Sequence, residues 1–213
     1  MTIYGISGLG ADERVFQQLT LSLPVVPIRW IPPNRSESLY HYALRLAKKA
    51  EDKDCILIGV SFGGVVAIEM SKIIKPRLTV LISSAATSRE LPWVYRLVGS
   101  VGILTLMPAF LFHPPPCLMY GLFGAKNKML LREILEDTDR SFAKWAIIQL
   151  THWSNRERLP RVVKIHGTQD RLIPYRRGRT TVPIQGGQHF MVVDRAQEVS
   201  RAIDKAFRQA GLM

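Results

Sequence analysis

The feature that most constrains this chain is an apolar run that leads through a glycine-flanked serine into a helical pattern. Residues Cys55–Val60 are apolar, Gly-Val-Ser-Phe-Gly-Gly occupies positions 59–64, and the helical stretch continues to Ile74. A G-x-S-x-G sequence in this context is typical of a sharp strand-to-helix turn that exposes the serine hydroxyl at the carboxyl edge of a sheet. Side chains at positions 59 and 63 would collide with neighbouring backbone, so glycine is needed there. The pattern predicts Ser61 as a nucleophile at a sheet edge.

Short apolar runs alternate with amphipathic segments along most of the chain, which predicts βα units around a parallel sheet. Asp194, with Gln197 three residues on, is expected to cap the last helix. Predicted strands lie near Thr2–Ser7, Val25–Ile31, Asp54–Val60, Leu78–Ser83, Arg161–His166 and Thr180–Ile184; predicted helices lie near Asp12–Leu21, Glu37–Ala50, Gly63–Ile74 and Asp194–Ala210.

Between about residues 86 and 159 this alternation stops. The segment contains three of the four tryptophans, three consecutive prolines at 114–116 and two helical patterns, Lys126–Glu136 and Asp139–Thr151. A helical insertion between two strands of the sheet is the simplest interpretation. We therefore expect a single domain, 1–213, with residues 86–159 as a cap.

A serine hydroxyl is a poor nucleophile without a base. His189 lies in Gly-Gly-Gln-His-Phe at 186–190, after the last predicted strand, where a glycine-rich loop can bring the imidazole over the sheet edge. Asp170 follows the strand that ends at His166, and the order Ser61, Asp170, His189 is the one expected for a triad on a parallel sheet. His166 is expected to be structural, and the other histidines, His41, His113 and His152, are expected on the surface or the cap.

Acyl transfer also needs two backbone N–H groups directed at the oxyanion. One normally belongs to the residue after the nucleophile, here Phe62, and the other to an early strand-to-helix loop, for which Leu9 in Ser7–Gly10 is our choice. The run from Gly5 to Gly10 has a second interpretation, a dinucleotide-binding turn. That alternative lacks the acidic residue expected about 20 positions later, where the second strand ends in Trp-Ile-Pro-Pro.

Composition excludes several other classes. The two cysteines have neither disulfide-framework nor zinc spacing. The N-terminus has no basic and apolar leader pattern, so the expected location is cytoplasmic.

The apolar stretch Leu97–Phe112 is too short for a membrane-spanning helix, but contact with a membrane surface stays open. The net charge of +12, without an aromatic and basic recognition module, predicts no specific nucleic-acid binding and leaves weak contact with an anionic surface open.

Over essentially its whole length, the chain resembles the α/β-hydrolase superfamily, through Ser7–Gly10, Gly59–Gly64, Gly167–Asp170 and Gly186–Phe190. The resemblance implies a reduced, mostly parallel sheet of about six strands flanked by helices, with a helical cap. It also implies Ser61 as nucleophile, Asp170 as acid, His189 as base, and Leu9 with Phe62 as oxyanion donors. Two departures stand out. Many members have His-Gly where this chain has Ser7-Gly8, and the antiparallel hairpin that precedes this strand in many members is not seen.

The expected activity is hydrolysis of a carboxylic ester or thioester with an apolar part, through an acyl-enzyme at Ser61. A small-molecule substrate is expected, with no cofactor and no metal; the oligomeric state is left open. Three alternatives also stay open. The same triad can support carbon–carbon bond hydrolysis, lyase chemistry or cofactor-free peroxidase chemistry. The fold could instead serve a non-catalytic binding protein, or the basic charge could serve binding to an anionic surface.

Overall fold

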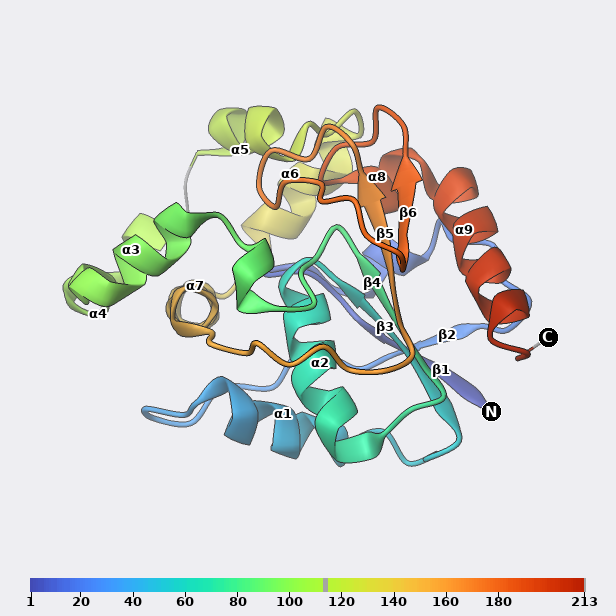
Figure 1. Ribbon diagram of the computed structural model, residues 1–213. Helices are drawn as coiled ribbons and strands as arrows, with labels where there is room; N and C mark the ends of the chain where they lie inside the picture. Colours follow the sequence, from blue (N-terminus) through green and yellow to red (C-terminus); the bar gives the residue numbers. More distant parts are fainter. Residues whose placement is uncertain (113–114, 213) are drawn as a thin grey trace.

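The computed structural model describes residues 1–112 and 115–212, and its centre is a sheet of six parallel strands (Figure 1). The order across the sheet is β2-β1-β3-β4-β5-β6, and every neighbouring pair is parallel. The strands are β1 (Thr2–Ile6), β2 (Val25–Pro27), β3 (Cys55–Val60), β4 (Leu78–Ile82), β5 (Val162–Gly167) and β6 (Thr181–Ile184). The prediction of a six-stranded α/β fold is confirmed.

Helices cover both faces of the sheet. The α-helices are α1 (Leu39–Ala47), α2 (Phe62–Ile74), α3 (Trp93–Val101), α4 (Ile103–Leu106), α5 (Pro116–Phe123), α6 (Lys128–Glu136), α7 (Arg140–His152), α8 (Met191–Asp194) and α9 (Ala196–Gln209). Three short 3-10 helices are η1 (Glu13–Phe16), η2 (Ser88–Glu90) and η3 (Ala109–Phe112). Helices α3 to α7 all lie between β4 and β5, within residues 86–159, where the sequence predicted a helical insertion.

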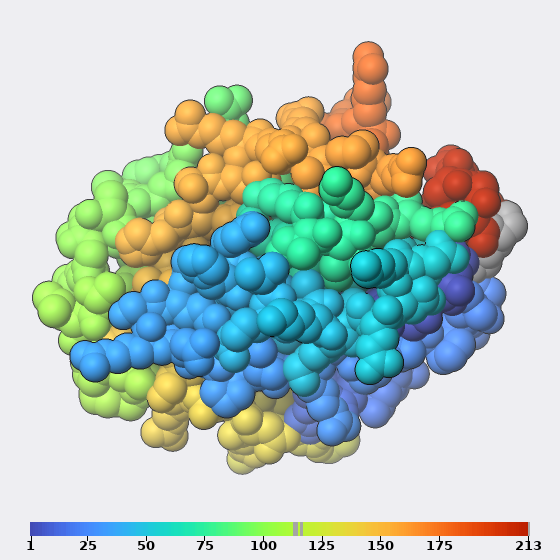
Figure 2. All heavy atoms as spheres, turned by 90° about the horizontal axis from the view of Figure 1, so that it is seen from below, coloured from blue at the N-terminus to red at the C-terminus, as the bar shows by residue number. Residues whose placement is uncertain are grey.

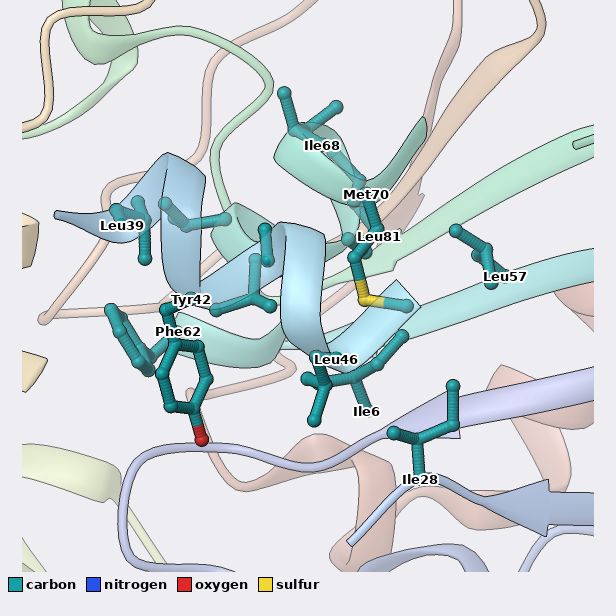
Figure 3. Close-up of a cluster of buried hydrophobic side chains, with 14 of the residues drawn as sticks. Ile6, Ile28, Leu39, Tyr42, Leu46, Leu57, Phe62, Ile68, Met70 and Leu81 are labelled. Atoms are coloured by element: carbon teal, nitrogen blue, oxygen red, sulfur yellow. The ribbon is translucent and has the colours of Figure 1, made fainter. Parts of the chain in front are cut away.

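Two hydrophobic clusters hold the layers together, and alternate side chains of each strand point into opposite clusters, as strand geometry requires. On one face, Leu57 and Leu81 pack against α1 and α2, where Tyr42 and Leu46 are fully buried (Figure 3). On the other face, the side chains of β3 and β4 meet α9, whose Phe207 is fully buried. The central strand β3 is buried along its whole length, as a parallel strand covered on both faces should be.

Three predictions about elements need correction. The helix expected at Asp12–Leu21 is only the 3-10 turn Glu13–Phe16, which Asp12 caps. The three leucines that follow, Leu19, Leu21 and Leu23, lie in an irregular loop and pack partly buried against the core.

The second strand is shorter than Val25–Ile31, because β2 lies at the sheet edge and contains Pro27, which has no N–H to donate. Asp194 does not cap the last helix. It ends α8, and its carboxylate accepts N–H bonds from Lys126 and Asn127 instead, at 2.7 and 3.0 Å.

Candidate active site

Ser61 stands at the junction of β3 and α2 in a strained backbone conformation. Its φ of 51° and ψ of −122° lie in a sparsely populated region for a residue with a side chain. Three hydrogen bonds hold the turn: Ser61 N–H donates to the Ile82 carbonyl, and the Ser61 carbonyl accepts from Gly64 N–H and from the Ser84 hydroxyl. The surrounding backbone therefore holds the Ser61 hydroxyl at the carboxyl edge of the sheet.

The glycines beside Ser61 are needed because backbone packs directly on backbone. A Cβ at Gly63 would lie 2.0 Å from the Ser7 carbonyl oxygen, and one at Gly59 would lie 2.5 Å from the Gly64 Cα. Both distances are shorter than any real contact of a side chain. Backbone contacts therefore require glycine at both positions, as the sequence pattern predicted, and at Gly63 the contact is with the loop that follows β1.

The three residues proposed as a triad form one hydrogen-bonded series. Ser61 Oγ lies 2.8 Å from His189 Nε2, and His189 Nδ1 lies 2.8 Å from Asp170 Oδ2. The simplest proton assignment has Nδ1–H donating to the carboxylate, which leaves Nε2 to accept the serine proton. His189 and Asp170 are buried, at 4% and 6% exposure, whereas Ser61 is half-buried and open to a cavity.

The Asp170 carboxylate is held ionised by its surroundings. Burial alone would raise its pKa, but the electrostatic attraction of His189, hydrogen bonds from His189 and Ile173, and the nearby imidazole of His166 outweigh burial and lower the pKa well below the usual range. Its other oxygen accepts the N–H groups of Leu172 and Ile173 at 2.9 and 3.0 Å. A fixed carboxylate of this kind can orient the imidazole and stabilise its protonated form.

The remaining histidines have other surroundings. His166 is buried; its Nε2–H donates to the Ile173 carbonyl at 2.7 Å and lies 3.4 Å from Asp170 Oδ2. It therefore supports the acid loop. His41 and His152 are exposed and bond within their own helices, whereas His113 lies outside the described residues.

The loop after β1 lies against the nucleophile, since a Cβ at Gly8 would be 3.6 Å from the Ser61 Cβ. Ser7 Oγ donates to the Ala11 carbonyl at 2.6 Å, so a loop-supporting contact exists without the histidine that many relatives have. Within residues 1–112 and 115–212, the N–H groups of Leu9 and Phe62 donate to no other group. Both donors proposed for an oxyanion are therefore unengaged.

Segments of the insertion close the site from above. Phe123 of α5 contacts the His189 ring edge-on, with ring centroids 5.2 Å apart. The Thr138 hydroxyl, between α6 and α7, lies 3.0 Å from the Gly10 carbonyl and 2.8 Å from the Ile134 carbonyl, and Tyr95 of α3 donates to the Leu172 carbonyl at 2.9 Å. These contacts could not be predicted from sequence, because each joins residues more than 60 positions apart.

A small apolar cavity of about 40 Å³ reaches Ser61 and His189. Its other lining residues are almost all apolar: Gly8, Leu9, Ala11, Val15, Val60, Phe123, Leu131, Ile134, Leu135, Phe190 and Val192. A larger surface hollow of about 600 Å³ lies elsewhere, between Lys72 and Arg161, and contains none of the three triad candidates. The cavity at Ser61 is therefore the space in which a reacting group would sit.

The part of the chain that the structure describes has neither a cluster of metal-binding side chains nor a helix that could span a membrane. Among residues 1–112 and 115–212, no three His, Cys, Asp or Glu side chains lie close enough together to hold a metal ion. None of the helices in those ranges is long and apolar enough to cross a bilayer.

A parallel sheet with a strained serine at a strand-to-helix elbow, hydrogen-bonded to a histidine and an aspartate, defines the class of α/β hydrolases. The sequence model of the alpha/beta hydrolase family matches residues 14–202, and the chain belongs to this family.

Solved structures with the same fold include several hydrolases. A thermophilic esterase has a TM-score of 0.72 at 18% identity, with 99% of this chain and 90% of that chain covered. A bacterial membrane phospholipase A has a TM-score of 0.71 at 18% identity, with 100% and 80% covered. The meta-cleavage product hydrolase of Pseudomonas fluorescens IP01 has a TM-score of 0.67 at 17% identity, with 99% and 91% covered. No curated protein matches by sequence.

Proposed function

We propose that this hydrolase is a serine esterase or thioesterase that transfers a short, apolar acyl group to water through Ser61. The observation that carries the proposal is the hydrogen-bonded series Ser61–His189–Asp170, with 2.8 Å at each step. A hydroxyl in this position can lose its proton to the imidazole as it attacks a carbonyl carbon.

The reaction proceeds in two halves. His189 Nε2 takes the Ser61 proton while Oγ bonds to the substrate carbonyl, and the N–H groups of Leu9 and Phe62 stabilise the oxyanion. Collapse of this intermediate releases the alcohol or thiol, which receives the proton from His189. Water then attacks the acyl-enzyme with His189 again as base, and the carboxylic acid leaves. Asp170 keeps the imidazole in the required tautomer throughout.

The size of the cavity supports a short acyl group. Its volume is about 40 Å³, against the roughly 10–15 Å³ that one water molecule needs. That is space for about three non-hydrogen atoms, the size of an acetyl group. The lining is apolar and comes partly from α5 and α6, which supports the segment 86–159 as a cap that selects the acyl chain.

Labelling with a fluorophosphonate probe tests the nucleophile. We expect the wild-type protein to be labelled and to give a burst of one p-nitrophenol per chain from p-nitrophenyl acetate, and Ser61→Ala to do neither. Ser83→Ala is the matched control, because Ser83 is a buried serine near the elbow whose hydroxyl has no partner among the described residues.

Labelling of Ser61→Ala equal to wild type would show that another residue is the nucleophile. A wild-type protein that gives neither a label nor a burst, while its circular dichroism shows it folded, would favour the other chemistries that this triad supports or a binding role.

A further inference from the structure

A band of apolar side chains faces solvent on the segment between β4 and β5. We define the apolar face by its members: Trp93, Val94, Leu97, Val101, Ile103, Leu106, Phe110, Leu111 and Leu118. Several are far more exposed than large apolar residues usually are, including Leu106 at 87%, Val101 at 67% and Trp93 at 66%. In Figure 2 the atoms of this segment, coloured lime, form the left-hand end of the molecule. Exposed apolar side chains concentrated on one segment in this way often mark an interaction site.

Contacts on the opposite side of α3 hold these side chains toward solvent. On α3 the exposed residues Trp93, Leu97 and Val101 recur every four positions and so share one side of the helix. The other side is anchored: Tyr95 donates to the Leu172 carbonyl, and Val98 packs in a small cluster with Leu104, Phe112 and residues of α7. The apolar face is therefore held outward by packed and hydrogen-bonded residues behind it.

The charge around the apolar face has one sign. No Asp or Glu occurs between Glu90 and Glu133, whereas Arg96, Lys126 and Lys128 lie within or beside the exposed segment. Arg96 is exposed and makes no ion pair with any described residue. The whole chain carries a net charge of +12. A partner with a negatively charged surface and an apolar interior would complement both the basic charge and the exposed apolar side chains.

We infer that the apolar face docks on the surface of an anionic lipid bilayer, with its Leu, Val, Phe and Trp side chains in the headgroup region. Amphipathic helices with Trp or Phe on one side and Lys or Arg beside them bind in this way. Each basic residue near an anionic membrane strengthens binding about fivefold. A second copy of the chain fits less well, because it brings a further charge of +12 to the interface. The proposal does not depend on hydrolysis at Ser61.

Cys117 gives a direct reporter of docking. It is exposed on α5, next to Leu118 of the apolar face, whereas Cys55 is fully buried and burial raises the pKa of its thiol to about 11. A polarity-sensitive maleimide dye should therefore label Cys117 alone. We expect its emission to shift to the blue with vesicles of phosphatidylcholine and phosphatidylglycerol at 7:3, and to change little with phosphatidylcholine alone.

Matched substitutions separate the apolar contact from general charge attraction. Leu106→Asp removes a member of the apolar face, whereas Leu44→Asp makes the same change at an exposed leucine of α1 outside that face. Both lower the net charge equally. In sedimentation with 7:3 vesicles, Leu106→Asp should weaken binding about tenfold or more and Leu44→Asp by twofold or less. Circular dichroism checks that both variants are folded.

Three results would overturn the inference. These are no binding to the anionic vesicles, equal weakening by the two variants, and a dimer that Leu106→Asp dissociates in sedimentation equilibrium without lipid. The last result would assign the apolar face to a second copy. Ser61→Ala should bind vesicles as wild type does, so failure of docking and failure of the proposed esterase activity can be told apart.

Discussion

The dependence of activity on acyl chain length is the property that the geometry of the cavity decides most directly. With about 40 Å³ beside Ser61, the proposed acyl pocket has room for an acetyl group and little more. We therefore expect kcat/KM for p-nitrophenyl esters to be greatest at acetate or propionate and to fall from butyrate onward.

Leu135→Ala tests this expectation by enlarging the cavity. Leu135 lies on α6, is half-buried and lines the cavity, and the substitution removes three carbon atoms. Each methylene that is newly accommodated is worth about 0.8 kcal/mol, or about fourfold. Pentanoate, three carbons longer than acetate, should therefore gain up to about 60-fold relative to acetate in the variant.

Leu130→Ala is the matched control for Leu135→Ala. Leu130 lies on the same helix and is also half-buried in the same hydrophobic cluster, but it does not line the cavity. Initial rates for a series from acetate to octanoate, measured for the three proteins, give the comparison. The reasoning fails if wild-type kcat/KM rises steadily to octanoate, or if Leu130→Ala shifts the preferred length as far as Leu135→Ala does.

Further outcomes follow from the site and its neighbours. Asp170→Asn should lower kcat by about 10⁴. Because the pKa of Asp170 is lowered by folding, its carboxylate stabilises the protein above its ordinary pKa of about 4 and loses that contribution as pH falls further, so urea midpoints of wild type and variant should converge in acid. Gly63→Ala should prevent folding, since its Cβ would lie 2.0 Å from a carbonyl oxygen, whereas Gly121→Ala, with open space around it, should stabilise α5 by about 0.5–1 kcal/mol. Asp194→Ala should cost about 1–2 kcal/mol in urea unfolding, with kcat per folded molecule little changed.

The local signals of the sequence predicted most of the fold. The predicted strand and helix around Ser61 agree with the structure. The apolar run, the glycine-flanked serine and the helical pattern together allow few other conformations for residues 55–74. The predicted helix at Asp12–Leu21 was wrong. Leu19 and Leu21 pack against the core from a loop, so their spacing in the sequence did not indicate a helix.

The surroundings of the site depended on long-range contacts that spacing does not reveal. Asp194 has the sequence neighbours of a helix cap, but its hydrogen-bond partners lie 67 and 68 positions earlier. Likewise, the sequence marked residues 86–159 as an insertion but did not indicate which side chains would reach Ser61. Phe123 and Leu135 line the cavity because α5 and α6 fold back over the carboxyl edge of the sheet.

At the elbow around Ser61, the two glycines are required for folding, whereas the serine is required only for the proposed catalysis. Glycine at 59 and 63 is required by contacts between main-chain atoms, whereas the side chain at 61 has an unfavourable φ of 51° that glycine would relieve. A library of variants selected only for folded protein should therefore retain both glycines and enrich Ser61→Gly. On the proposed mechanism, descendants of this chain that no longer need catalysis should lose the serine while keeping both glycines.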